Sequence, residues 1–217
     1  MRPNFESVRR PVNIFFMRHG ESEGNRLGIL QGHEDPPLTD DGQAQATRAG
    51  EWFQNRGVER VFCSPLSRAH HTARIVSEKA ELPVPEVLPD LIELDIGKFS
   101  GLTRQEIERK YPLEWRSFRL QSWDGVDGAE SSDKLYRRAC RVWTRILKEA
   151  EEGADGILCV SHGGLLQWII RASMAGPDQS WLPLYPASNC GIFHFFLAPA
   201  LPDEGFYAQW KHLNLIV

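Results

Sequence analysis

Two apolar stretches that each end at a histidine constrain the fold of this chain more than any other feature. Val12–Phe16 leads into Met17-Arg18-His19-Gly20-Glu21, and Ile157–Val160 leads into Ser161-His162-Gly163-Gly164. Consecutive apolar side chains are typical of strands in a parallel sheet whose two faces are both covered. Ligands of open α/β sheets bind at the carboxyl ends of such strands. The sequence therefore predicts that both histidines lie at one edge of a sheet, in a ligand site.

The order of the other expected elements predicts a three-layer α/β/α sandwich around a mainly parallel central sheet. Thr39 and Asp40 can cap a helix over about 40–56, and Ser64 is expected to cap a second helix with Pro65 at its first position. Further helices are expected over about 131–151 and after Gly164, and further strands at about 60–63, 191–197 and 206–213.

One segment, over about residues 98–128, interrupts this alternation of strands and helices. Its short helices are broken by Pro112, which predicts a lid-like helical insertion. With 217 residues, 41% of them hydrophobic, the chain can bury one sizeable core. We therefore expect a single domain over residues 1–217 that carries this insertion.

Charge and hydrophobic patterning limit the partners of the chain. The formal net charge of −4 gives no general affinity for nucleic acid or for a membrane surface. No apolar run approaches the length of a membrane span, and Ile14–Met17 is too short for the core of a signal peptide. The four cysteines lack metal-ligand spacing. We expect a cytoplasmic location. The sequence leaves open whether the chain forms a homodimer.

The residue types around the two histidines suit a phosphoryl group. Arg18 can bind phosphate through two parallel hydrogen bonds, and a neutral imidazole at His19 can attack phosphorus to form a phosphohistidine. Arg68 is expected in a first helical turn, where a cation is unfavourable unless an anion binds beside it. His162 can stabilise the charge of phosphoryl oxygens. Each residue alone is as typical of a structural role, but together they favour a site for a small phosphorylated substrate.

Such a site also needs a proton donor, because an alkoxide is a poor leaving group. Glu93 is flanked by Ile92 and Leu94, and apolar surroundings favour a protonated carboxyl. Asp95 is the competing candidate. The chemistry of the two residues separates them only weakly.

A metal site is the main alternative use of the histidines, of which the chain has seven. Arg18 adjoins His19, however, and Arg68 is expected at the same place. Clustered guanidinium groups repel a divalent cation and attract a dianion. We therefore assign no metal ligand.

Several short motifs follow one another in an order known from one protein family. They are Met17-Arg18-His19-Gly20-Glu21-Ser22, Asn25, Gln31-Gly32, Pro37-Leu38-Thr39, Gly42, Ser64-Pro65-Leu66-Ser67-Arg68-Ala69, Glu93, Gly97, Ser100-Gly101, Gly128–Ser131 and Ser161-His162-Gly163-Gly164. This set resembles the histidine phosphatase superfamily, the phosphoglycerate mutase-like group, over about residues 12–197. The resemblance implies that His19 is the phosphorylated nucleophile. It also implies that Arg18, Arg68 and His162 form the phosphate pocket and that Glu93 donates and accepts the proton.

The resemblance extends to the substrate-binding residues and to the cofactor. Asn25, Gln31 and Gly32 would line the entrance or contact the phosphoryl group, and Gly163 is assigned to substrate binding. The phosphatase branch of the family implies neither a metal nor an organic cofactor.

The choice between branches of the family rests on two segments. Leu91–Gly101 looks most like the small broad-specificity phosphatases and the α-ribazole phosphatases. Two short departures from many relatives, at Lys98-Phe99 and at Pro36-Pro37, leave the substrate open. Mutases of the family usually carry a Trp-Asn pair where this chain has Glu23-Gly24-Asn25. We therefore expect a phosphomonoesterase that acts on small phosphorylated metabolites. A cofactor-dependent phosphoglycerate mutase is the first alternative, and a non-catalytic phosphoester-binding regulatory protein is the second.

Overall fold

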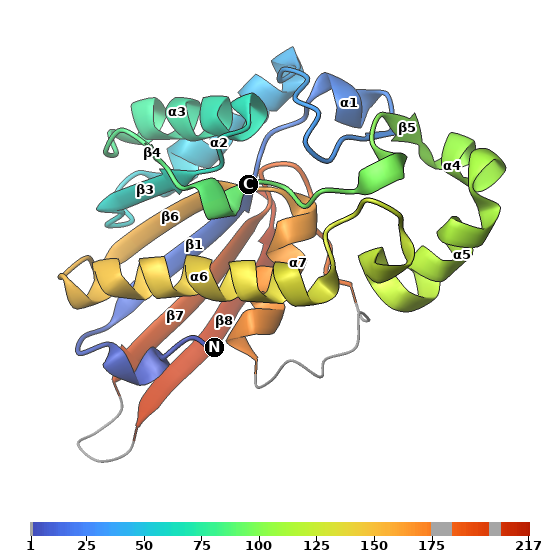
Figure 1. The fold of residues 1–217 in the computed structure, drawn as a ribbon. Helices are drawn as coiled ribbons and strands as arrows, with labels where there is room; N and C mark the ends of the chain where they lie inside the picture. Colours follow the sequence, from blue (N-terminus) through green and yellow to red (C-terminus); the bar gives the residue numbers. More distant parts are fainter. Residues whose placement is uncertain (1, 175–183, 200–204) are drawn as a thin grey trace.

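The computed structural model describes residues 2–174, 184–199 and 205–217, and its centre is a six-stranded sheet of order β4-β3-β6-β1-β7-β8 (Figure 1). The strands β4, β3, β6 and β1 are parallel, whereas β7 and β8 are antiparallel to their neighbours. Their bounds are β1 Val12–Arg18, β3 Arg60–Cys63, β4 Glu86–Val87, β6 Gly156–Ser161, β7 Ile192–Pro199 and β8 Phe206–Leu215.

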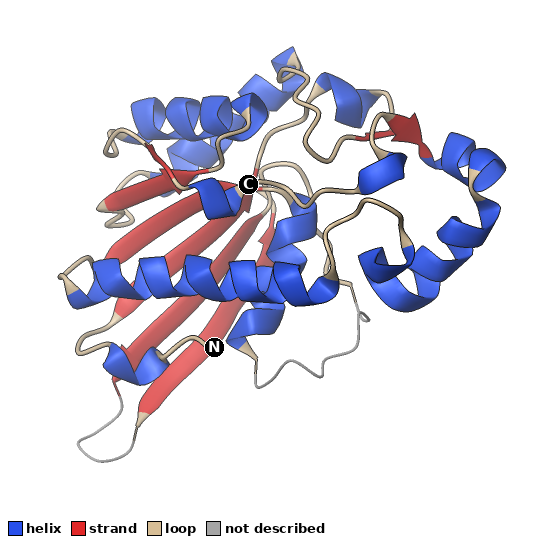
Figure 2. Cartoon of the chain, viewed as in Figure 1, coloured by secondary structure: helices blue, strands red, loops and turns tan. Residues whose placement is uncertain are grey.

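Helices cover both faces of this sheet (Figure 2). One face packs against α2 (Asp40–Phe53) and α3 (Ser67–Ala80), and the other against α6 (Ser132–Glu151) and α7 (Gly163–Ser173). The predicted three-layer α/β/α sandwich with a mainly parallel sheet is confirmed.

The central strand β1 has four consecutive apolar side chains, Ile14–Met17, because both of its faces are covered. Ile14 and Phe16 belong to the core under α6 and α7, whereas Phe15 and Met17 belong to the core under α2 and α3. All four side chains are at most 3% exposed. A strand buried on both faces alternates between two cores, so its sequence has no polar face.

The helix that carries Arg68 begins later than the sequence predicts. Ser64 was expected to be its N-cap, but α3 begins at Ser67 after Leu66, whose side chain caps nothing. The hydroxyl of Ser64 accepts the Leu66 N–H instead and lies 2.7 Å from Nε2 of His162. The prediction that Ser64 caps this helix is therefore wrong, because the Ser64 side chain bonds to His162, which follows the neighbouring strand β6.

The segment after β1 and the helical insertion form a second, smaller unit at the edge of the sheet. The strand β2 (Ile29–Leu30) follows α1 (Glu23–Arg26) and pairs with β5 (Leu102–Thr103). The insertion continues with α4 (Arg104–Lys110), α5 (Pro112–Gln121) and the 3₁₀ turn η4 (Ser122–Gly125). Three more 3₁₀ turns occur earlier in the described chain, namely η1 (Phe5–Ser7), η2 (Pro89–Leu91) and η3 (Gly97–Phe99). The predicted short helices with a break at Pro112 are confirmed, and their action as a lid remains a prediction.

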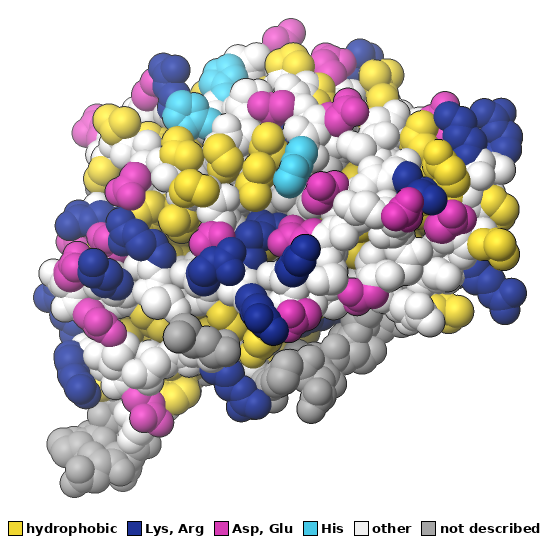
Figure 3. Space-filling view, viewed as in Figure 1, with side chains coloured by type: hydrophobic (Ala, Val, Ile, Leu, Met, Phe, Trp, Pro, Cys, Tyr) yellow, Lys and Arg dark blue, Asp and Glu magenta, His cyan; other side chains and the backbone are white. Residues whose placement is uncertain are grey.

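The surface carries interspersed charges of both signs (Figure 3). On α6, Arg141 pairs with Asp90, and Lys148 pairs with Glu152. In the described ranges, no helix is both long enough and apolar enough to span a bilayer.

Candidate active site

The carboxyl ends of β1 and β6 bring the two histidines together. Arg18 and Ser161 are register partners in these parallel strands, so His19 and His162, one residue further on, lie side by side. Their ring centroids are 5.1 Å apart, and both side chains are at most 2% exposed. The predicted meeting of the two strand ends is confirmed.

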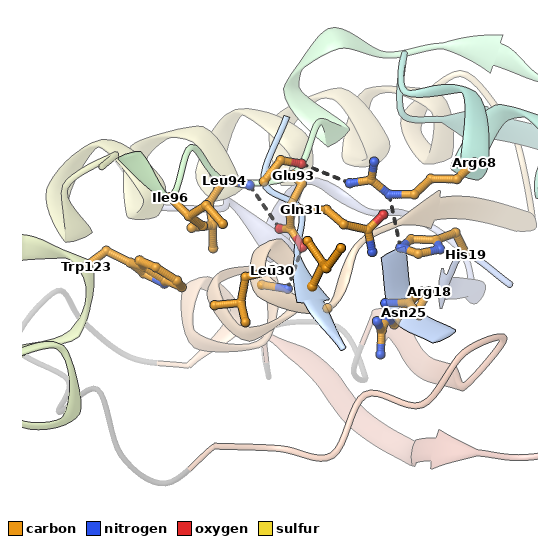
Figure 4. A pocket seen from close by; sticks show the side chains of 14 residues that line it. Arg18, His19, Asn25, Leu30, Gln31, Arg68, Glu93, Leu94, Ile96 and Trp123 are labelled. Carbon is orange, nitrogen blue, oxygen red and sulfur yellow. Dashed lines mark hydrogen bonds between the residues drawn. The ribbon is translucent and has the colours of Figure 1, made fainter. Parts of the chain in front are cut away.

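The imidazole of His19 is held as one tautomer. Its Nδ1 lies 2.7 Å from the carbonyl oxygen of Gly20, which can only accept, so Nδ1 carries the proton. Its Nε2 accepts a hydrogen bond of 3.3 Å from Nε of Arg68 (Figure 4). Burial, and then the guanidinium groups of Arg18 and Arg68, lower the pKa of His19 well below its ordinary value. The ring is therefore neutral, and its lone pair is on Nε2.

His162 lies behind His19 and is held by Ser64. The Ser64 hydroxyl already accepts the Leu66 N–H, so it can donate its own proton to Nε2 of His162. Burial lowers the pKa of His162 well below its ordinary value, as do the charges of His19 and the two arginines. With Nε2 as acceptor, Nδ1 carries the proton. That buried atom has no hydrogen-bond partner among the described residues, so it is a donor that is available to an anion.

Arg18 has a buried donor without a partner, and Arg68 is held in place by several acceptors. Nη1 of Arg18 donates to the carbonyl of Ala187 at 2.7 Å, whereas its buried Nε has no partner in the described ranges. Arg68 is 1% exposed, and its Nη1 and Nη2 donate to the carbonyl oxygens of Glu34 and Gly32. The loop after β2 therefore fixes the Arg68 guanidinium beside His19.

Glu93 is held by backbone amides rather than by apolar side chains. Its Oε1 accepts hydrogen bonds from the N–H groups of Leu94 (2.9 Å) and Leu165 (3.0 Å), and its Oε2 accepts one from Gly164 (3.1 Å). Apolar Leu94 lines the same cavity, and the sequence did not reveal these three amide donors. The amides of Gly164 and Leu165 belong to the first turn of α7, whose free N–H groups favour an acidic partner.

The backbone of Glu93 is also fixed on both sides. Arg138 of α6, 6% exposed, donates to the carbonyl of Ile92, and Nε2 of His33 lies 2.8 Å from the carbonyl of Glu93. Asp95 is exposed and accepts the N–H of Gly97. Because Asp95 does not line the cavity described next, the structure favours Glu93 over Asp95 as the group that faces a ligand.

A cavity of about 290 Å³ contains nearly all of the predicted site residues (Figure 4). His162, which is fully buried, is the exception. The lining residues are Arg18, His19, Asn25, Ile29, Leu30, Gln31, Gly32, Arg68, Glu93, Leu94, Ile96, Trp123, Gly163 and Gly164.

Asn25 and Gln31 present their amide nitrogens to this cavity. The Ser22 hydroxyl lies 3.0 Å from Oδ1 of Asn25 and 2.9 Å from Oε1 of Gln31 and donates its one proton to either oxygen, while the Ser22 N–H donates to Oδ1 of Asn25. Asn189 donates to the same oxygen of Asn25. With the oxygens engaged, the NH₂ groups are the polar atoms left for a ligand, which suits an anion.

Sequence reasoning missed several residues that build the site. Ser64 holds His162, Arg138 holds the segment before Glu93, and Asp35 binds the start of α3. Gly164 also leaves space for this site, since a Cβ there would clash with Cδ2 of Leu94 and would lie 2.7 Å from Oε1 of Glu93. The glycine pair after His162 was a signal, but it did not distinguish Gly164 from Gly163.

The site chemistry favours an anion over a cation. In the described part of the chain, no group of three or more histidine, cysteine, aspartate or glutamate side chains is placed to hold a metal ion. Nε of Arg18 and Nδ1 of His162, both buried close to His19, have no hydrogen-bond partner among the described residues and can only donate.

The fold and the site define a class of α/β proteins in which two histidines and two arginines meet at the carboxyl edge of a parallel sheet. Residues 14–198 match the model of the histidine phosphatase superfamily (branch 1). The match covers most of the chain, which therefore belongs to this superfamily. The resemblance found in the motifs is confirmed.

Known relatives include both phosphatases and a mutase. The chain is 29% identical to an adenosylcobalamin/alpha-ribazole phosphatase of Salmonella typhimurium, over 78% of this chain and 83% of the relative. It is 30% identical to a broad-specificity phosphatase of Saccharomyces cerevisiae, over 74% of this chain and 69% of the relative. A 2,3-bisphosphoglycerate-dependent phosphoglycerate mutase of Bartonella henselae is 29% identical, over 73% of this chain and 80% of the relative.

Solved structures share the fold. The structure titled Mycobacterial hydrolase 1 superposes with a TM-score of 0.81 at 23% identity, and the alignment covers 96% of this chain and 100% of that one.

Proposed function

We propose that this protein is a phosphomonoesterase that hydrolyses small phosphorylated metabolites through a phosphohistidine on His19. The observation that carries the proposal is the neutral, buried His19, whose ring lies 5.1 Å from that of His162 in a site where Nε of Arg18 and Nδ1 of His162 have no partner among the described residues. An imidazole in this state is a nucleophile, and the donors suit the oxygens of a phosphoryl group.

In the first step, Nε2 of His19 attacks phosphorus and the bond to the ester oxygen breaks. The carbonyl of Gly20 stabilises the positive charge that develops on the ring. Glu93 in its acid form gives its proton to the leaving oxygen, so the product is a neutral alcohol. Oε2 accepts one amide and Oε1 accepts two, so Oε2 has the free position for that proton.

In the second step, water attacks the phosphoryl group and the bond between phosphorus and Nε2 breaks. The Glu93 carboxylate accepts a proton from this water, which restores the acid form. Arg18, Arg68 and His162 bind the phosphoryl oxygens in both steps, and Asn25, Gln31, Gly32 and the backbone of Gly163 border the substrate. The proposed reaction needs no metal or organic cofactor. We also propose that the enzyme is cytoplasmic.

A phosphoglycerate mutase is the competing function, because a mutase is among the relatives. A mutase must keep water away from phosphorylated His19 until a second substrate hydroxyl arrives. The deciding assay supplies 3-phosphoglycerate with and without 2,3-bisphosphoglycerate and measures 2-phosphoglycerate and free phosphate. We expect phosphate release to dominate, and bisphosphate-dependent interconversion that outpaces it on every monoester would overturn the proposal.

The covalent intermediate provides the direct test. Rapid quenching with a phosphorus-labelled monoester should label wild-type protein on His19 in an acid-labile form, and His19→Ala should carry no label and show no turnover. EDTA should leave the activity unchanged, and vanadate should compete with substrate. Binding of phosphate without turnover by the wild type would favour the non-catalytic alternative.

A further inference from the structure

The cavity has a polar end and an apolar end. In Figure 4, Arg18, His19 and Arg68 lie at one end, and Ile96 and Trp123 lie at the other. Leu30 and Leu94 lie between them, as does Glu93. If the phosphoryl group binds at His19, the alcohol that leaves past Glu93 extends toward the apolar end.

Three separate segments build this apolar end. Leu30 comes from β2, Leu94 and Ile96 come from the segment that holds Glu93, and Trp123 comes from η4 at the end of the helical insertion. Leu94 and Ile96 are at most 4% exposed. Apolar side chains that converge on one region of a cavity favour an apolar ligand group.

Trp123 is anchored as a wall of the cavity. Its ring centroid lies 4.5 Å from that of Phe118 and 6.4 Å from that of Phe99. The side chain is 7% exposed, and its buried Nε1 has no partner in the described ranges. A fixed indole offers a flat surface on which a ring of the ligand can pack.

The cavity offers no positive charge to a second anionic group on the substrate. Among the described lining residues, the only lysine or arginine side chains are Arg18 and Arg68. Arg68 already donates to two carbonyl oxygens, and both arginines lie at the His19 end. A carboxylate or second phosphate at the apolar end would lose its hydration without gaining a cation.

We propose that the apolar end, formed by Leu30, Leu94, Ile96 and Trp123, is the subsite for the leaving alcohol. The substrates are then phosphomonoesters of uncharged alcohols that carry an apolar, ring-sized group close to the ester oxygen. This inference rests on the proposed phosphatase function and names its substrate class.

The first test compares three primary alkyl phosphates, whose ester bonds are of similar reactivity. Benzyl phosphate supplies the apolar ring, glycerol 1-phosphate supplies neither ring nor charge, and 3-phosphoglycerate supplies a carboxylate. We expect kcat/KM to fall in that order, by about 10- to 100-fold from benzyl to glycerol phosphate, which is the scale of burying one ring. Comparable kcat/KM values, or a preference for 3-phosphoglycerate, would overturn the subsite while leaving phosphatase activity intact. Absence of phosphate release from all three would contradict the proposed function as well.

Two variants locate the preference in the subsite. Trp123→Ala should lower kcat/KM for benzyl phosphate by about tenfold and leave glycerol 1-phosphate nearly unchanged. Leu30→Lys, which places a cation at the apolar end, should raise kcat/KM for 3-phosphoglycerate relative to glycerol 1-phosphate. The matched control is Leu120→Lys on α5, which makes the same change at a side chain that is 72% exposed and outside the cavity.

These variants also keep the test decisive if one of them fails to fold. Leu30 is only half-buried, so its replacement puts little of the core at risk. An equal loss for benzyl and glycerol phosphates in Trp123→Ala, or no difference between Leu30→Lys and Leu120→Lys, would show that the apolar end does not contact the leaving alcohol.

Discussion

Asp35 binds both the backbone and the side chain of Arg68. Its Oδ1 lies 3.4 Å from the Arg68 N–H and 3.4 Å from Nη1, and its Oδ2 accepts the N–H of Ser67 at 2.7 Å. Leu66 cannot cap α3, so Asp35, 32 residues before Ser67, supplies the missing cap. One carboxylate therefore stabilises the start of the helix and orients the arginine that faces His19.

We predict that Asp35→Ala weakens both functions. Loss of the cap should lower the free energy of unfolding by about 1 kcal/mol, measured by urea denaturation. Loss of the ion pair should raise the inhibition constant of vanadate, since Arg68 is then less well fixed. Asp35→Asn keeps a cap acceptor without the charge, so it should recover most of the stability and less of the affinity. If Asp35→Ala and Asp35→Asn had the same free energy of unfolding and the same inhibition constant for vanadate, the separate roles of the cap and the charge would be contradicted.

The two glycines after His162 should differ sharply when each is replaced by alanine. A Cβ on Gly164 would clash with Cδ2 of Leu94 and would lie 2.7 Å from Oε1 of Glu93, whereas a Cβ on Gly163 would meet nothing closer than Nε of Arg18, at 3.5 Å. Displacement of the Glu93 carboxyl by about 1 Å should lower kcat by about 100-fold in Gly164→Ala. Gly163→Ala should stay within a few-fold of wild type. Steady-state kinetics test this, and a similar loss in both variants would argue that the glycines act through the backbone alone.

Glu93→Gln should slow alkyl phosphates far more than activated aryl phosphates, because an aryl oxide leaves without a proton. The loss on alkyl esters should be about 10²- to 10⁴-fold, the usual scale for a general acid. Asp95→Asn is the matched control, since Asp95 is exposed and outside the cavity. The assignment would be reversed if the dependence on the leaving group followed Asp95 instead.

Stability should fall with acid because histidines are buried in their neutral form. Burial, and then Lys211 and His212, lower the pKa of His194 to about 4, and its Nε2 lies 2.9 Å from Oδ1 of Asn13. An unfolded histidine has a pKa of about 6.5, so between these two values the unfolded chain binds more protons than the folded one. The free energy of unfolding therefore decreases as the pH falls through this window.

The variant His194→Gln tests this source of acid sensitivity, because glutamine keeps a donor for Asn13 and cannot titrate. The free energy of unfolding, measured in urea between about pH 7 and pH 4.5, should depend less on pH in the variant, because the variant takes up as much as one proton fewer on unfolding. An unchanged slope would mean that His194 is not the group that titrates.

The sequence alone determined the elements that depend on local pattern. Continuous apolar runs predicted β1 and β6 as strands covered on both faces, and their turn residues placed His19 and His162 at the same sheet edge. Arg18, next to His19 in the chain, followed from the same pattern. These predictions succeeded because side-chain periodicity and strand direction are fixed by neighbouring residues.

Only the tertiary structure decided how the site is held and what its cavity can accept. The contact of Glu93 with Gly164 spans 71 residues, and that of Ser64 with His162 spans 98. The apolar end likewise joins Leu30 and Trp123 from different segments. Local periodicity carries no information about which distant backbone donors and apolar side chains become neighbours. That depends on how the layers pack. The sequence predicted a local capping role for Ser64 and apolar neighbours for Glu93, whereas folding supplied a histidine partner for Ser64 and three amide donors for Glu93.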